Sequence, residues 1–131
     1  MSIPNILVID DDEARAERLA ESLRLHGFHA KSASSGEAHE LVRGGIAPDF
    51  AIVELMLQGT HGFELTRALR AAHPSLRVLL TSDYHFTETQ LEKVDCGAMG
   101  FVARPFGAEH VADYLRGKVR APSLSPAEQK L

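Results

Sequence analysis

Two short, fully apolar runs that each end at an acidic residue constrain the fold of this chain more than any other feature. The first covers residues 6–9 and precedes Asp10, and the second covers residues 50–53 and precedes Glu54. Runs of this length, rich in branched residues, are typical of strands that are buried on both faces of a parallel sheet. An acid placed directly after such a strand is expected at the carboxyl edge of that sheet.

Segments with helical periodicity alternate with strand-like runs along the chain, and capping or breaking residues mark where each helix begins or ends. Further strands are expected at residues 28–32, 78–80 and 101–102. The first expected helix begins at Asp12 and ends at Gly27, and the second begins at Ser34 or Ser35 and ends near residue 43. The third begins at Thr60 and ends before Pro74. The fourth begins with a capping box at residues 87–90, and the fifth covers residues 108–117. Five strand–helix units predict an α/β protein with a doubly wound parallel sheet, right-handed crossovers and helices on both faces.

The length of 131 residues fits one domain, which we expect to span residues 1–119, with residues 120–131 as a C-terminal tail or linker. A net charge of −4 gives no electrostatic reason to expect nucleic acid binding. The single cysteine, Cys96, excludes an intrachain disulfide and is expected as a small core residue. We find no charged leader and no apolar run of about 20 residues, so we expect a cytoplasmic protein without a membrane contact.

Polar residues follow four of the expected strands. Asp10 and Asp11 follow the first strand, Glu54 the third, Thr81 the fourth and Arg104 the fifth. Ligands of such sheets bind beyond the carboxyl ends of the strands, so these side chains are expected to converge. Three carboxylates should raise the pKa of at least one of them unless a cation compensates. The sequence therefore indicates a candidate site for Mg²⁺, which prefers oxygen ligands.

Taken together, these motifs resemble the receiver domain of response regulators, and the resemblance covers residues 6–119. It rests on the first strand with its acidic pair, on residues 48–54, on Thr81 and on residues 97–106 with their Arg–Pro pair. The resemblance implies a flavodoxin-like sheet with strand order 2-1-3-4-5. It also implies a signalling module of a two-component phosphorelay and not an enzyme.

In receiver domains the residue at the position of Glu54 is an aspartate that accepts a phosphoryl group from a kinase phosphohistidine. The resemblance further implies that the Arg104–Pro105 bond is cis, which an X-Pro bond tolerates at low cost. It assigns Mg²⁺ to Asp10, Asp11, Glu54 and the backbone carbonyl of Met56, phosphoryl oxygens to Thr81 and Arg104, and the aromatic switch to Phe101.

The sequence departs from the receiver pattern at Glu54, Gln58 and Arg104, where the family has aspartate, commonly proline, and lysine. Glutamate is one methylene longer, and a displacement of about 1 Å can cost a hundredfold in rate. Arginine is a planar fork that prefers bidentate pairing with a carboxylate. We therefore expect a standing Glu54–Arg104 pair, weak or absent Mg²⁺ binding, and an atypical receiver that ordinary phosphorylation does not switch. Three roles of Glu54 stay open: it mimics the phosphorylated state, it occupies an inert site on an interaction scaffold, or, since glutamate is also a carboxylate, it keeps a residual phosphorylation.

The partners implied by the resemblance are signalling proteins, either a histidine kinase or a downstream effector. The surface of the fourth helix, fifth strand and fifth helix is the expected docking face, and it is also a candidate homodimer contact. Ordinary solvated charge explains the same residues equally well. The residues expected on this face are Glu92, Lys93, Asp113, Tyr114 and Arg116.

Two other classes of protein share parts of the pattern. Haloacid-dehalogenase-like phosphatases use an Asp-x-Asp motif, which Asp10 and Asp12 fit, although Arg104 stands where a lysine is expected. Hydrolysis of an aryl phosphate would identify that class. A flavodoxin-type cofactor binder would present hydroxyls after the first strand, where the acids of this chain would repel a flavin phosphate. A yellow colour of the purified protein would identify it.

The remaining polar and aromatic side chains are expected to have structural roles. Histidines near the site are expected to be exposed or to pack in loops, and arginines of the helices to face solvent. These residues are His61 and His85 in loops, Tyr84 and Phe86 packing over the loop after Thr81, Arg67 and Arg70 on the third helix, and Arg15 on the outer side of the first.

Overall fold

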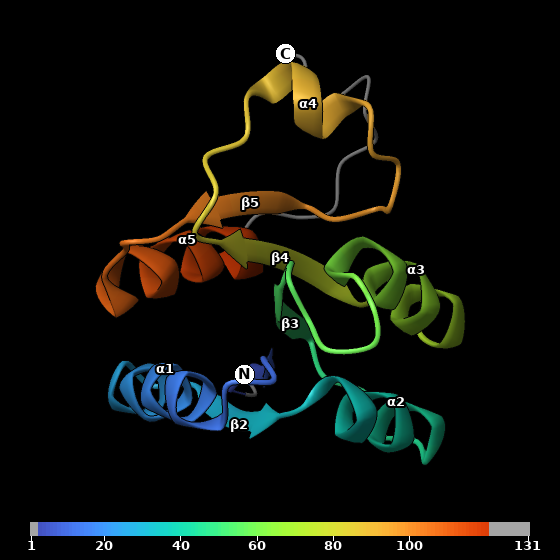
Figure 1. Cartoon of the computed structure of the whole chain (residues 1–131). Helices are drawn as coiled ribbons and strands as arrows, with labels where there is room; N and C mark the ends of the chain where they lie inside the picture. The colour runs from blue at the N-terminus through green and yellow to red at the C-terminus, as the bar shows by residue number, and fades with distance from the viewer. Residues whose placement is uncertain (1–2, 121–131) are drawn as a thin grey trace.

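A computed structural model describes residues 3–120 and contains the expected alternation of strands and helices (Figure 1). The strands are β1 (Asn5–Ile9), β2 (His29–Ala33), β3 (Phe50–Glu54), β4 (Arg77–Ser82) and β5 (Gly100–Ala103). The helices are α1 (Glu13–Leu25), α2 (Ser35–Arg43), α3 (Gly62–Ala72), α4 (Glu88–Glu92) and α5 (Ala108–Arg120). No helix within residues 3–120 has the length and apolar character that spanning a bilayer requires.

The strands form one parallel sheet with the order β2-β1-β3-β4-β5, which confirms the predicted fold class. β1 and β3 lie in the interior of the sheet, where both faces are covered, and this explains their continuous apolar sequence. The register pairs Glu54 with Thr81, and Ser82 with Ala103. The polar groups that follow β1, β3, β4 and β5 therefore share one edge of the sheet.

Helices cover both faces, with α1 and α5 on one side and α2 and α3 on the other (Figure 1). Each face has its own apolar cluster. Ala20 and Leu23 of α1 and Leu115 of α5 lie in the first cluster, and Leu65 and Leu69 of α3 lie in the second. Because α1 begins directly after β1, its first turn lies beside the carboxyl edge of the sheet.

Capping interactions explain where most helices begin. The side chain of Asp12 accepts a hydrogen bond from the backbone of Arg15 at 3.1 Å, as predicted for the start of α1. Ser34 forms a full capping box with Glu37 at α2, so Ser34 and not Ser35 is the cap. The predicted box before α4 is also present, with reciprocal bonds between Thr87 and Gln90.

Three predictions about the helices were wrong. α3 is capped by His61 and not by Thr60, because Nδ1 of His61 accepts from the backbone N–H of Phe63 at 3.3 Å. α5 does not end at Gly117 but continues to Arg120, the last described residue. Arg70 does not face solvent: it is half-buried and donates to the carbonyls of Pro74 and Leu76. The predicted tail lies outside the described residues, except for Arg120 itself.

Candidate functional site

The carboxyl edge of the sheet brings the side chains of four strand ends together, as the sequence predicts. Asp10 follows β1, Glu54 ends β3, Thr81 lies in β4 and Arg104 follows β5. Asp10, Glu54 and Thr81 are buried, and Arg104 is largely covered. The Arg104–Pro105 bond is cis, as predicted.

The Glu54 carboxylate is only 2% exposed and is engaged on both of its oxygens. Its Oε2 accepts from Nη1 of Arg104 at 2.6 Å and from Oγ1 of Thr81 at 3.4 Å. Its Oε1 accepts from the backbone N–H of Met56 at 3.3 Å. The ion pair between Glu54 and Arg104 that the sequence predicts is therefore present in the structure.

The guanidinium group of Arg104 contacts two carboxylates, those of Glu54 and Asp83. While Nη1 binds Glu54, Nε donates to Oδ1 of Asp83 at 2.8 Å. Burial by itself would lower the pKa of Arg104, but the hydrogen bonds that it donates to Glu54 and Asp83 outweigh burial, and the pKa is raised. The same contact lowers the pKa of the exposed Asp83 carboxyl. Asp83 was not among the predicted site residues, although an acid two residues beyond Thr81 was visible in the sequence.

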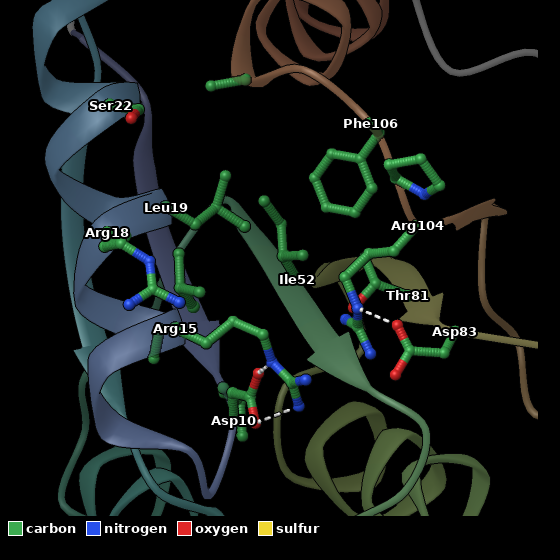
Figure 2. Close-up of a pocket in the computed structure, with 15 residues that line it drawn as sticks. Asp10, Arg15, Arg18, Leu19, Ser22, Ile52, Thr81, Asp83, Arg104 and Phe106 are labelled. Carbon is green, nitrogen blue, oxygen red and sulfur yellow. Dashed lines mark hydrogen bonds and ion pairs between the residues drawn. The ribbon is translucent and has the colours of Figure 1, made fainter.

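A second arginine completes the site, and the sequence analysis missed it. Arg15 was expected on the outer side of α1, but Figure 2 shows its guanidinium turned toward Asp10 at the edge of the sheet. Nε binds Oδ2 of Asp10 at 2.5 Å, Nη2 binds Oδ1 of Asp10 at 3.0 Å, and Nη2 lies 3.8 Å from Oε2 of Glu54. The hydrogen bond to Asp10 is the largest influence on Arg15 and raises its pKa above the ordinary value.

Asp11 contacts a different set of partners. Its carboxylate accepts from the backbone N–H and hydroxyl of Ser35 at 2.8 and 3.0 Å, and from the backbone N–H of Gln58 at 2.7 Å. Burial tends to raise the pKa of Asp11, but these hydrogen bonds outweigh it and lower the pKa. Asp11 therefore connects the loops after β1, β2 and β3, and its pKa is lowered and not raised as repulsion among three carboxylates would make it.

The three carboxylates predicted to hold Mg²⁺ do not form a ligand cluster. Within the described part of the chain, no three side chains of His, Cys, Asp or Glu are arranged to hold a metal ion. Each predicted ligand already accepts hydrogen bonds: Asp10 from Arg15, Asp11 from Ser35 and Gln58, and Glu54 from Arg104. No buried side-chain oxygen or nitrogen of the described residues lacks a partner. The residues as arranged do not fit a divalent cation, and the Met56 carbonyl as a ligand stays a prediction.

A cleft of about 540 Å³ lies next to the two arginines, between α1 and the segment that joins β5 to α5 (Figure 2). Leu19 of α1, Ile52 of β3 and Phe106 supply apolar walls, while Arg15 and Arg104 lie at its end near the acids.

Phe101 occupies a partly covered position in β5. Its ring meets that of Phe86 edge to face, with 5.3 Å between ring centroids, and both pack against the apolar cluster on the α2 and α3 side. The packing role predicted for Phe86 is confirmed, whereas Tyr84 is 61% exposed and contacts only the ring of Phe86 among the aromatic side chains described. A switch role for Phe101 stays a prediction.

Several remaining predictions concern the surface. His85, Arg67, Glu92 and Lys93 are exposed, and Cys96 is buried as expected.

His61 packs against the ring of Phe63 as well as capping α3. Asp113 is exposed and Tyr114 is half-buried on α5. Arg116 was wrongly placed on the docking face, because it binds the carbonyl of His26 at 2.7 Å and lies over the ring of Phe28, at the far end of α1.

The contacts of the acids after β1 also bear on the two alternative classes, the haloacid-dehalogenase-like phosphatase and the flavodoxin-type cofactor binder. A phosphatase nucleophile at Asp10 would need a free carboxylate oxygen, but both oxygens of Asp10 bind Arg15, and Asp12 caps α1. The residues that follow β1 are acids, whereas a flavin phosphate site would have hydroxyls there. Neither alternative is favoured by an observation in the described structure.

Comparison with known proteins gives one family. A model of the response regulator receiver domain matches residues 6–116 of the chain. The photosynthetic apparatus regulatory protein RegA of Rhodobacter capsulatus is 29% identical over 117 residues, covering 89% of this chain and 64% of RegA. Response regulator MprA of Mycobacterium sp. (strain KMS) is 30% identical over 119 residues, covering 90% of this chain and 51% of MprA. The chain thus spans less than two thirds of either relative.

Solved structures agree with this result. A receiver domain protein described as CheY-like, from Methanospirillum hungatei JF-1, superposes with a TM-score of 0.79 at 20% identity, covering 90% of this chain and 94% of that one. A response regulator from Burkholderia pseudomallei, solved with a phosphorylated aspartic acid, a calcium ion and citrate, gives a TM-score of 0.73 at 28% identity, covering 97% of this chain and 80% of that one. Because the family match covers most of the described residues and the sheet has the same order, this chain belongs to the response regulator receiver domain family.

Proposed function

We propose that this chain is an atypical receiver module that acts through protein contacts and is not switched by ordinary phosphorylation. The observation that carries the proposal is the 2.6 Å contact between Oε2 of Glu54 and Arg104, with Thr81 on the same oxygen. In the receiver family, a hydroxyl and a cation at these two positions take the oxygens of the phosphoryl group. Here the corresponding groups hold the carboxylate of residue 54 itself.

The extra methylene of glutamate explains this difference. It carries the carboxylate outward from β3 toward the groups that would otherwise hold a transferred phosphoryl group. The related response regulator from Burkholderia pseudomallei carries its phosphoryl group on an aspartic acid, which is one methylene shorter. Glu54 therefore resembles a fixed, weaker substitute for a phosphorylated acceptor, which supports phosphoryl mimicry over an inert site.

The same contacts disfavour Glu54 as a nucleophile. An attacking carboxylate oxygen must approach the incoming phosphorus in line, and catalysis of phosphoryl transfer depends on positioning and on neutralising charge. Oε2 already accepts from Arg104 and Thr81, while Oε1 faces the backbone of Met56. A phosphodonor would have to break a buried ion pair before it could reach either oxygen.

Phosphorylation is tested by incubating the chain with acetyl phosphate and Mg²⁺ and measuring its intact mass. We expect no adduct on the native chain and an adduct on the variant that combines Glu54→Asp and Arg104→Lys, which restore the family residues at these two positions, with Arg15→Met, which frees Asp10. Glu54→Ala is the matched control for labelling elsewhere. A stable adduct that maps to Glu54 of the native chain would defeat the proposal.

Amide hydrogen exchange distinguishes a Glu54 that imitates a phosphorylated acceptor from an inert site. If Glu54 imitates a phosphorylated acceptor, Glu54→Gln should increase amide exchange in the loop of residues 83–87 and in β5, because Thr81 and Arg104 lose a charged partner. An inert scaffold should show changes only at the residues that touch position 54. Thr66→Ser, a mild change at a buried hydroxyl of α3, is a control for general loosening.

We propose that the partners are a histidine kinase or a downstream effector, docked on the surface of α4, β5 and α5. Lys93 is an exposed charge on this surface, whereas Arg116 contacts the carbonyl of His26 at the end of α1, and Asp113 pairs with Arg116 at 2.8 Å. The same surface is a candidate homodimer contact. Light scattering of the native chain and of Lys93→Glu tests the dimer, and equal monomer masses for both proteins would remove it from the proposal.

A further inference from the structure

The three acids that the receiver resemblance assigns to Mg²⁺ are each held by donors of the chain itself. Asp11 binds neutral donors, namely the backbone and hydroxyl of Ser35 and the backbone of Gln58. Asp10 and Glu54 instead face guanidinium groups. The two kinds of partner differ in consequence, because only a guanidinium supplies the positive charge that a metal ion would bring.

Arg15 lies where that positive charge is needed. Its guanidinium takes both oxygens of Asp10 in the bidentate geometry that arginine favours, and its Nη2 also approaches Oε2 of Glu54. It therefore joins the acid that follows β1 to the acid that ends β3. A divalent cation that bridged the same two strand ends would have to displace this side chain.

The charge balance of the site agrees with this placement. Arg15 and Arg104 supply two positive charges, and the buried acids Asp10 and Glu54 supply two negative charges. Asp83, the remaining acid on Arg104, has a side chain that is 75% exposed to solvent. Asp11 adds a third negative charge at this edge, but its partners are the neutral donors of Ser35 and Gln58. Around Asp10 and Glu54 the two guanidinium groups balance the two carboxylates, so a divalent ion placed there would meet no excess of negative charge.

We propose that Arg15 is a built-in counter-ion that stands in the place of the divalent cation, so that this receiver site does not depend on metal. Loss of the Arg15 guanidinium exposes a divalent-cation site made of Asp10 and Glu54 with water. The inference rests on the proposed function in one respect, since both treat Glu54 as a fixed member of a closed ion-pair network. Its test nevertheless uses no phosphodonor.

Metal binding is measured directly, by calorimetric titration of Mg²⁺ and by the change in Tm between Mg²⁺ and KCl at equal ionic strength. We expect no saturable heat and no specific Tm shift for the native chain. Arg15→Met keeps the aliphatic volume and removes the charge, and we expect it to bind Mg²⁺ saturably, with a Kd about tenfold or more below the lower bound that the titration of the native chain sets. Arg15→Lys keeps the charge and should not gain binding.

Arg18→Met is the matched control. Arg18 lies on the same helix and lines the same cleft, and it is exposed. Its loss removes an equal charge from the region without freeing Asp10, so a gain of metal binding in Arg15→Met alone separates local displacement from a general change in potential. An equal gain in both variants would overturn the proposal.

Other outcomes decide the matter as well. Saturable Mg²⁺ binding to the native chain with the same affinity as to Arg15→Met would overturn the proposal, as would a folded Arg15→Met variant without any Mg²⁺ binding. Arg15→Gln replaces the methionine variant if circular dichroism shows that the latter is unfolded. An acetyl phosphate adduct on native Glu54 would defeat the proposed function while leaving the metal titrations to decide this inference.

Discussion

At the scale of single residues, the Glu54–Arg104 pair determines how the site responds to substitution. Removing one partner of a buried ion pair leaves an uncompensated charge, and this usually costs about 3 kcal/mol or more. Arg104→Ala should therefore lower the free energy of unfolding by about 3 kcal/mol, with Arg15 at 3.8 Å from Glu54 offsetting part of the loss. Urea denaturation followed by circular dichroism measures it.

The complementary substitution should cost less. Glu54→Gln leaves Arg104 with its contact to the exposed Asp83, so the remaining cation stays paired and hydrated. The double variant with Arg104→Met should be closer to Glu54→Gln than to Arg104→Ala, because it leaves no buried charge without a partner. A loss below about 1 kcal/mol for Arg104→Ala would mean that the pair behaves like an exposed one.

The lowered pKa of Asp11 makes the stability of the fold depend on pH. Its folded pKa lies below the ordinary value of 3.8 because hydrogen bonds from Ser35 and Gln58 outweigh burial. The sign follows: ionised Asp11 stabilises the fold fully above pH 3.8, and this contribution is lost as the pH falls through its lowered folded pKa. The difference in free energy of unfolding between the native chain and Asp11→Asn should shrink on acidification in that window. A difference that grows instead would contradict the assignment.

At the scale of elements, the start of α1 links helix capping to the site. Asp12 caps the helix through the backbone of Arg15, so the cap and the counter-ion share the same turn. Asp12→Ala should cost about 1 kcal/mol and increase amide exchange in the first turn. Ser34→Ala, which removes the cap of α2, should have a similar cost without affecting that turn. Equal exchange at Arg15 in the native chain and Asp12→Ala would disprove the link.

The elements also show what the sequence can and cannot predict. β1 and β3 are predictable from the sequence because burial on both faces requires an unbroken apolar run, and the acids at their ends locate the edge of the sheet. The sequence favours Thr60 as the cap because hydroxyls often cap helices. In the structure His61 pairs with Met56, just after β3, and this residue caps α3 instead. Such local path differences depend on tertiary packing.

Arg15 was missed for a related reason. Helical periodicity describes which side of α1 faces the apolar cluster, and Arg15 does not lie on that side. Its contact with Asp10 depends instead on how α1 leaves β1, since only the first turn overlies the edge of the sheet. Asp83 and Ser35 likewise come from loops whose paths the pattern of apolar residues does not specify.

At the scale of the whole molecule, one sheet joins two apolar clusters on opposite faces. Leu23 lies in the cluster beside α1 and α5, and Leu69 lies in the cluster beside α2 and α3. Because both are fully buried, Leu23→Ala and Leu69→Ala should each lower the free energy of unfolding by about 3 kcal/mol. Since the sheet separates them, the losses should add in the double variant to within about 0.5 kcal/mol.

Denaturant unfolding with two probes checks this expectation. Far-ultraviolet circular dichroism reports the helices of both faces, and tyrosine fluorescence reports Tyr84 and Tyr114. Coincident transitions are expected for the native chain and for all three variants, because each face loses its support when the shared sheet unfolds. Separate transitions, or a large interaction energy in the double variant, would show that the two faces are not joined in this way.

The guanidinium groups of Arg15 and Arg104 both approach Oε2 of Glu54, and this arrangement limits how the three residues can change during evolution. A mutation that shortens the acid draws its carboxylate away from both guanidinium groups, and a mutation of either arginine removes one of the two counter-charges of Glu54. Each single change should therefore weaken the network, whereas a concerted change can restore its charge balance. We expect homologues that inherit this trio to keep it intact, and lineages that abandon it to show replacements at all three positions.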